Sequence, residues 1–309
     1  LPATLIFDHP TARQLADFFA SSGMQEALQE NLPATLPATG LPAARLEALA
    51  ARVGVFGLAA TLPAGVGAPS ALRCAAACGS ELVREVPPER WGDERLSELD
   101  SLSPEVALRA RHGGWLADPS LFDPARFSVS PAEAAAVDPQ QRLLLERGYE
   151  ALHGAGMDKA ALGGSLVGVF LGIAANDWQS VAAQSAAGKS VYAATGGSMS
   201  IAAGRLSFVL GLQGPCVSYD TACSAALVAA HGAAGALQRD ECPSALVAGV
   251  SLMLLPGVSV TFATAGMLSA RGRCHTFDAR ADGYARAEAC ATFSLQRVAG
   301  AAAVLATWS

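Results

Sequence analysis

Hydrophobic and small residues between Gly211 and Gly232 follow the order strand, corner, helix. Val217 and Tyr219 suit a buried strand, together with the apolar residues that precede them. The run 225–230 predicts a helix, because alanine and leucine are strong helix formers. The small residues of 220–224 form the corner between the two elements.

Cys223 lies in that corner, just before the predicted helix. A thiol at a helix N terminus is close to the positive end of the helix dipole and to unpaired N–H groups, which favour the thiolate. The same N–H groups can hold a developing oxyanion. Cys223 is therefore a candidate nucleophile, and the alternative is a buried cysteine that acts as a small hydrophobe.

Apolar runs elsewhere predict further buried strands, at 53–58, 167–172 and 245–250. Two helices have clear start signals. Ser130 with Pro131 and Glu133 forms a capping box with proline at the first helical position, and Asp138-Pro139 opens a second helix in the same way. Strands that alternate with helices predict an α/β fold.

The segment 242–270 contains no charged residue and is long enough to span a bilayer. Prolines, glycines and hydroxyl residues interrupt it, however, and its apolar residues cluster in runs of strand length. This pattern is typical of a buried strand and its connection in a parallel sheet covered on both faces. We therefore expect no membrane segment.

The first 52 residues differ in pattern from the rest. Residues 1–22 predict a short helix, with Thr11 and Gln14 as a capping box and Leu15, Phe18 and Phe19 at helical spacing. In 23–52, the tetrapeptide Leu-Pro-Ala-Thr occurs twice in succession, and this density of Pro and Thr favours an extended spacer.

The composition of the chain argues against several classes of function. The chain has 309 residues, of which 51% are hydrophobic and 16% charged, enough to bury a sizeable core. The net charge of −6, with no basic run, argues against a nucleic-acid partner. The seven cysteines form no regular framework, which favours a reducing compartment. Cys74 and Cys78 are spaced like metal ligands, but no second cluster completes a site, so we expect no metal.

The corner sequence 220–227, DTACSAAL, resembles the active-site cysteine motif of β-ketoacyl synthases, specifically the ketosynthase domains of modular polyketide synthases. The resemblance extends over most of the chain. It includes EVPPERW at 85–91, DPQQRLLLE at 138–146, SMSIAAGRLS at 198–207 and GRCHTFD at 272–278. In the first segment, LIFDHPT at 5–11 resembles the end of an acyl carrier protein.

The resemblance implies a domain order and a fold. Residues 1–22 are then the C-terminal remnant of a carrier protein, 23–52 a linker, and 53–309 the N-terminal half of a ketosynthase. The expected fold is a thiolase-like layered α-β-α arrangement, of which the second half is missing. The DPQQRLLLE string has a structural role in the family.

The implied reaction is decarboxylative Claisen condensation, in which Cys223 accepts an acyl group from a carrier thioester and a malonyl-type extender then attacks it. The family also uses two histidines, in HGTGT-like and NxGH-like motifs. None of the five histidines here has either context, and His231 is eight residues from Cys223, roughly 12 Å along a helix. The chain as given is therefore expected not to complete the reaction.

The resemblance also implies acyl carrier proteins as partners and a homodimer, with 215–219 at its interface. No cofactor is expected to bind directly, since phosphopantetheine belongs to the partner carrier. The location implied is the cytoplasm, with an organelle left open.

The sequence departs from the family pattern at three positions. Gly204 replaces a usual asparagine, and Ala287 and Ala289 replace glycines beside Glu288, where methyl groups are expected to crowd a loop of unusual backbone angles. Two alternatives stay open: a fatty-acid-type condensing enzyme or thiolase relative, and a non-catalytic scaffold that dimerises or docks carriers.

Overall fold

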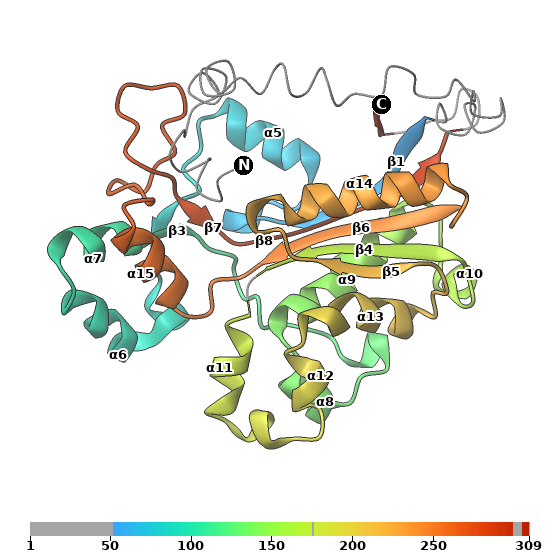
Figure 1. The fold of residues 1–309 in the computed structure, drawn as a ribbon, viewed down its shortest axis with the longest axis horizontal. Helices are drawn as coiled ribbons and strands as arrows, with labels where there is room; N and C mark the ends of the chain where they lie inside the picture. Colours follow the sequence, from blue (N-terminus) through green and yellow to red (C-terminus); the bar gives the residue numbers. More distant parts are fainter. Residues whose placement is uncertain (1–51, 175, 299–304, 309) are drawn as a thin grey trace, which may run out of the picture. The chain divides into compact units, whose positions relative to one another are not determined.

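The computed structural model describes residues 52–174, 176–298 and 305–308. Its main sheet has six strands in the order β5-β4-β6-β8-β1-β9 (Figure 1). They are β1 (Val53–Thr61), β4 (Val167–Ile173), β5 (Cys216–Tyr219), β6 (Ser244–Ser251), β8 (Ala289–Arg297) and β9 (Ala306–Trp308). Strands β5, β4 and β6 are parallel, whereas β8 runs antiparallel to β6, and β1 antiparallel to both β8 and β9.

Helices cover both faces of this sheet. In Figure 1, α14 (Ala225–Gln238) lies on one face, and α9 (Pro139–Gly154) and α13 (Met199–Leu210) lie on the other. Side chains of β4 alternate between the two layers: Val169 and Leu171 pack with α9 and α13, and Phe170 packs with α14. Because both faces are buried, the strands appear in the sequence as continuous apolar runs.

A smaller unit packs beside the main sheet. It contains a three-stranded sheet in the order β2 (Arg84–Glu85), β3 (His112–Gly114), β7 (Arg286–Ala287). Trp91 and Trp115 meet edge to face in its core, with ring centroids 5.3 Å apart. The indole N–H of Trp91 donates to the Met253 carbonyl at 3.0 Å, which links this core to the segment after β6.

The described residues contain further helices and 3₁₀ turns. The helices are α5 (Pro69–Ala77), α6 (Pro88–Asp100), α7 (Pro104–Ala110), α8 (Pro131–Ala136), α10 (Lys159–Leu162), α11 (Trp178–Ala183), α12 (Ala193–Gly196) and α15 (Gly257–Thr264). The 3₁₀ turns are η1 (Pro63–Gly65), η2 (Ala125–Phe127), η3 (Ala186–Lys189) and η4 (Ala222–Ser224).

The structure confirms the predicted strands at 53–58, 167–172 and 245–250, and both helix starts. Ser130 accepts the N–H of Glu133 at 3.1 Å and caps α8, as the capping box predicts. In 242–270 the expected buried strand is β6, and the connection after it contains the helix α15, which the sequence did not predict. No helix in the described part of the chain is both long and apolar enough to cross a membrane. The predicted carrier remnant and linker lie outside the described residues.

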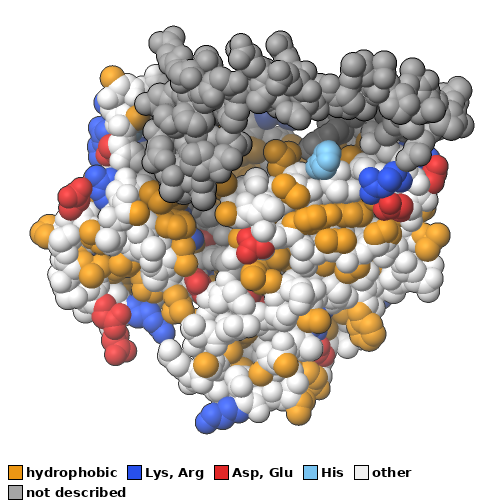
Figure 2. Space-filling view, in the orientation of Figure 1, with side chains coloured by type: hydrophobic (Ala, Val, Ile, Leu, Met, Phe, Trp, Pro, Cys, Tyr) orange, Lys and Arg blue, Asp and Glu red, His pale blue; other side chains and the backbone are white. Residues whose placement is uncertain are grey.

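The outer face of α14 is apolar. Leu227 on this helix is 63% exposed, and Figure 2 shows hydrophobic side chains gathered along the helix. Exposed apolar patches on globular proteins are typical of surfaces that another protein layer covers.

Asp138 anchors the start of α9 from a buried position. Its Oδ1 accepts the Gln140 N–H at 2.8 Å, and its Oδ2 accepts from the Gln140 side-chain amide at 3.1 Å. The Gln140 side-chain oxygen in turn accepts the N–H of Leu252 at 3.2 Å, so the cap connects α9 to the end of β6. Burial raises the pKa of Asp138 to about 6, against the lowering effect of Gln140 and Arg142.

We expect this buried carboxyl to make stability depend on pH. Because its pKa is raised on folding, from 3.8 to about 6, its contribution is fully present below pH 4 and is lost as the pH rises through 6. The loss amounts to about 3 kcal/mol. Urea unfolding of the protein and of Asp138→Asn between pH 4 and 7 measures this loss. We expect the free energy of unfolding to change with pH at a different slope in the two proteins. Parallel slopes for the two proteins would contradict the assignment.

Candidate active site

The corner that carries Cys223 has the predicted form. β5 ends at Tyr219, η4 contains Cys223, and α14 begins at Ala225. Cys223 is exposed. The alternative of a buried cysteine that only fills the core is therefore wrong.

Polar contacts and a strained backbone hold this corner. Asp220 Oδ1 accepts the N–H of Ala222 at 3.1 Å, and the Ser224 hydroxyl donates to the Thr221 carbonyl at 2.9 Å. Ala222 has φ of 53°, a left-handed conformation that a non-glycine residue adopts only when its surroundings impose it. Ser224 is the N-cap residue of α14, but its side chain makes no cap hydrogen bond, so it does not occupy the N–H groups of the first turn.

Two glycines let the start of α14 lie directly on the sheet. A Cβ at Gly172 of β4 would be 2.4 Å from the Ala226 nitrogen, and one at Gly249 of β6 would be 2.9 Å from the Ala226 Cβ. Both are too close for any side chain. The first turn of α14, and with it Cys223, is thereby fixed above β4 and β6.

Several loops meet at the same sheet edge. Gly172 pairs with Tyr219 on one side and Gly249 on the other, and Gly249 pairs with Ala291 of β8. β8 is antiparallel to its neighbour, so its first residues lie where β4, β5 and β6 end. The carboxyl ends of parallel strands are the usual place for a ligand site in α/β folds.

Tyr284 lies in the loop before β7 and pairs with Leu268. Its backbone N–H donates to the Met267 carbonyl at 3.0 Å, and its carbonyl accepts the Ser269 N–H at 3.0 Å. Burial raises the pKa of Tyr284, Arg286 lowers it, and Cys223 raises it further. The sequence reasoning did not predict this electrostatic influence of Cys223 on Tyr284.

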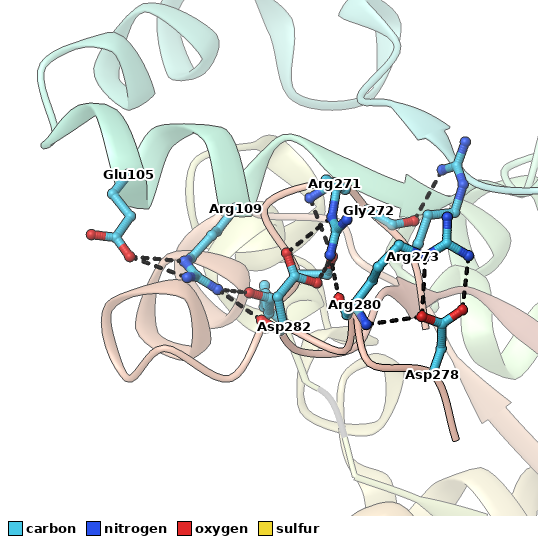
Figure 3. Close-up of polar contacts among 10 residues, drawn as sticks. Glu105, Arg109, Arg271, Gly272, Arg273, Asp278, Arg280 and Asp282 are labelled. Atoms are coloured by element: carbon cyan, nitrogen blue, oxygen red, sulfur yellow. Dashed lines mark hydrogen bonds and ion pairs between the residues drawn. The ribbon is translucent and has the colours of Figure 1, made fainter. Parts of the chain in front are cut away.

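Figure 3 shows how the loop that carries Tyr284 is held. Arg109 of α7 donates to the carbonyls of Leu268 and Asp282 and pairs with Glu105 at 3.1 Å. Within the loop, Asp282 pairs with Arg271 at 3.4 Å. These contacts connect α7 to both ends of the loop and so fix its course beside the corner.

Glu288 joins three segments from a fully buried position between β7 and β8. Its carboxylate accepts the N–H groups of Leu116 and Met253, both at 2.9 Å, and pairs with Arg90. Burial raises the pKa of Glu288, while Arg90 and the two N–H donors lower it.

The neighbouring alanines do not strain the backbone. Neither Ala287 nor Ala289 has a positive φ, so the expectation of unusual backbone angles is wrong, because these residues lie in the extended strands β7 and β8. The Ala287 methyl instead limits Gly114 on β3, where an added Cβ would be 2.8 Å from it.

Other candidate residues do not join the site. In the described part of the chain no histidine forms a hydrogen bond with Cys223; His112 contacts the Leu108 carbonyl, and His231 lies on the exposed surface of α14. His9 lies outside the described residues. Cys74 and Cys78 are exposed on and just after α5, and the described residues contain no group of three or more metal-ligating side chains.

Comparisons with known proteins agree with this geometry. The family model "Beta-ketoacyl synthase, N-terminal domain" matches residues 50–301. Polyketide synthase GfsB of Streptomyces halstedii is 40% identical over 302 residues, which cover 97% of this chain and 5% of that protein. The pikromycin polyketide synthase component PikAII of Streptomyces venezuelae is 39% identical over 306 residues, 97% of this chain and 8% of that protein.

Solved structures share the fold. The ketosynthase from module 6 of the bacillaene synthase of Bacillus subtilis 168 matches with a TM-score of 0.68 and 32% identity, over 80% of this chain and 39% of that one. The oxazolomycin ketosynthase domain OzmH KS7 of Streptomyces albus JA3453 matches with a TM-score of 0.71 and 31% identity, over 80% and 43%.

The chain therefore belongs to the β-ketoacyl synthase family. The part that it contains is the N-terminal domain of a β-ketoacyl synthase of the type found in modular polyketide synthases. It spans 39% and 43% of these two solved ketosynthases, and 5% and 8% of the two curated relatives.

Proposed function

We propose that this chain supplies the acyl-accepting part of a polyketide-synthase ketosynthase, with Cys223 as the nucleophile. The observation that carries the proposal is the exposed thiol on a strained corner immediately before α14, in a chain of the β-ketoacyl synthase family. Strain beside a reactive group is typical of functional sites, where the surrounding structure holds it in place.

The proposed step is transfer of an acyl group between two thiols. The Cys223 thiolate attacks the thioester carbonyl of an acyl carrier protein, and a tetrahedral oxyanion forms beside the first N–H groups of α14. When this intermediate collapses, the bond from the carbonyl carbon to the carrier sulfur breaks. The carrier thiolate leaves and takes up a proton, and the acyl group stays on Cys223.

Condensation is the second part of the proposal. Attack of a malonyl-type carbanion on the acyl-cysteine requires loss of carbon dioxide from the extender. The resemblance assigns this step to two histidines in HGTGT-like and NxGH-like motifs, and no histidine of this sequence lies in either motif. We propose that the 309-residue chain performs acyl loading and does not condense by itself. The phosphopantetheine arm is part of the partner carrier and is a substrate here.

We expect selective acylation of Cys223. After incubation with an acyl-N-acetylcysteamine thioester, digestion and mass spectrometry should find the acyl group on Cys223 and not on Cys74 or Cys78, which are also exposed. Cys223→Ala should remove the label. Cys78→Ala is the matched control and should leave loading unchanged.

The scaffold alternative predicts a different result. A scaffold needs no reactive thiol, so folded protein that stays unlabelled at Cys223 while Cys74 reacts would favour it. Equal labelling of all exposed cysteines would also contradict a nucleophile site.

We further propose that the chain forms a homodimer through β5. This strand lies at one edge of the main sheet, and Cys216 and Val217 are exposed on it. An exposed apolar edge strand is a ready template for pairing with another copy. Sedimentation equilibrium should show a dimer that Val217→Lys converts to a monomer, whereas a dimer that survives this change would refute the assignment to β5.

A further inference from the structure

Arg286 is a half-buried cation with few partners. It lies on β7, where its Nη1 donates to the Ser259 hydroxyl at 2.7 Å and its guanidinium lies 5.5 Å from the ring centroid of Phe262. Among the described residues, no carboxylate comes within 4.0 Å of it, which leaves most of its five N–H donors unused.

Among the other arginines of limited exposure, Arg90, Arg147 and Arg205 each have a carboxylate partner, whereas Arg142 donates to the Ser120 carbonyl at 3.0 Å. Two acids act on Arg286 from nearby without forming an ion pair with it: Asp177 accepts the Leu255 N–H at 3.0 Å, and Glu288 pairs with Arg90. A buried charge without a counter-ion is unfavourable, so binding an anion at Arg286 would relieve a penalty that the protein alone does not remove.

The position of Arg286 connects it to the nucleophile. β7 leads directly into β8, whose first residues lie at the sheet edge where β4, β5 and β6 end. The corner with Cys223 follows β5 and lies over the same edge, because Ala226 packs on Gly172 and Gly249. Tyr284, two residues before Arg286, is held between Met267 and Ser269 by backbone hydrogen bonds, which fixes the segment that leads into β7.

We propose that Arg286 binds an oxyanion of the thioester substrate that approaches Cys223. Two groups on such a substrate carry this chemistry: the free carboxylate of a malonyl-type extender and the phosphate of the pantetheine arm. Guanidinium groups bind both kinds of oxyanion in a bidentate manner. The proposal rests on the proposed role of Cys223 as the site where the thioester reacts.

The test compares an anionic with a neutral thiol reagent. Iodoacetate carries a carboxylate and iodoacetamide does not, so the ratio of their rates at one cysteine reports a nearby cation and cancels differences in thiol reactivity. Mass spectrometry resolves the ratio at Cys223 and, as internal controls, at Cys74 and Cys78. We expect the ratio at Cys223 to exceed that at Cys74 by about 10-fold.

Variants assign the effect to the side chain. Arg286→Gln should bring the ratio at Cys223 down to that of Cys74, Arg286→Lys should keep part of the effect, and Arg239→Gln, a surface control, should change nothing. Equal ratios at Cys223 and Cys74 in the unmodified protein would overturn the proposal without any variant. So would an elevated ratio that Arg286→Gln leaves unchanged.

Protection of Cys223 from iodoacetamide then identifies the anion. The amide analogue of malonyl-N-acetylcysteamine offers only a carboxylate and cannot transfer its acyl group, pantetheine 4′-phosphate offers only a phosphate, and the acetyl amide analogue offers neither. Arg286→Gln should raise the half-protecting concentration about 10-fold for one of the first two and leave the third unchanged. An equal change for all three, or none, would overturn the proposal. The rate ratio needs no acyl transfer, so it can support Arg286 even if acyl loading fails.

Discussion

Gly172→Ala is expected to lower the rate of acyl loading on Cys223 by about 100-fold and to destabilise the fold. The added methyl would be 2.4 Å from the Ala226 nitrogen and 2.5 Å from the Ala225 carbonyl carbon. These are backbone atoms that cannot rotate away, so the start of α14 must shift. Overpacking of this kind costs about 1–3 kcal/mol, and misplacing a reacting group by about 1 Å can reduce a rate by about 100-fold.

The matched control is Gly204→Ala on α13. No heavy atom lies within 4 Å of a Cβ added there. Alanine in the middle of a helix is more favourable than glycine by about 0.5–1 kcal/mol, so this variant should be slightly more stable and load at the normal rate. Urea unfolding measures the stability of both variants, and the rate of acyl loading on Cys223 measures the effect on the site. Normal loading by Gly172→Ala would mean that the contact between β4 and α14 does not position Cys223.

Glu288→Ala is expected to destabilise the protein by about 3–5 kcal/mol, the usual effect of breaking a buried ion pair. It leaves the N–H groups of Leu116 and Met253 without an acceptor and Arg90 without its counter-ion. The unfolding midpoint in urea, followed by tryptophan fluorescence, measures the loss, because Trp91 and Trp115 report on the adjoining core.

A double variant tests the physical cause. If the loss comes from the stranded Arg90 charge, Arg90→Met combined with Glu288→Ala should be less destabilised than the sum of the two single changes. Additive effects would show that the carboxylate acts mainly through the two backbone N–H groups. A loss below about 1 kcal/mol for Glu288→Ala would contradict the conclusion that this carboxylate stabilises the fold by joining three segments.

Local signals in the sequence were sufficient to predict the strand, corner and helix around Cys223. The residues that cap α8 and α9, the apolar runs of β4 and β6, and the small residues around Cys223 act on their immediate neighbours, and all of them predict what the structure contains. The exposure of Cys223 was not predictable in this way. It depends on how closely α14 lies on Gly172 and Gly249, which are far away in the sequence.

The positions of Tyr284, Arg286 and Glu288 depend on contacts between residues that are far apart in the sequence. Arg90 and Glu288 meet across the fold, and the pairing of β3 with β7 brings Gly113 beside Arg286. Nothing in the local pattern around Tyr284 or Arg286 predicts that they lie beside Met267–Ser269 and α15, respectively. The helix α15 was missed for a related reason, because a short buried apolar run has no periodicity that distinguishes strand from helix.

The pairing of β1 with β8 has a consequence for how the chain assembles. Thr61 of β1 pairs with Cys290 of β8, so β1 cannot pair with β8 until β8 has been synthesised. At about 5–20 residues per second, a ribosome takes roughly 10–50 s to cover that interval. β4, β5 and β6 can pair with one another before then, and β8 afterwards adds to β6 and brings β1 into the sheet. Because β8 follows directly on Glu288, the addition of β8 also brings Glu288 to the edge where Cys223 lies, and only the pairing of β9 with β1 remains.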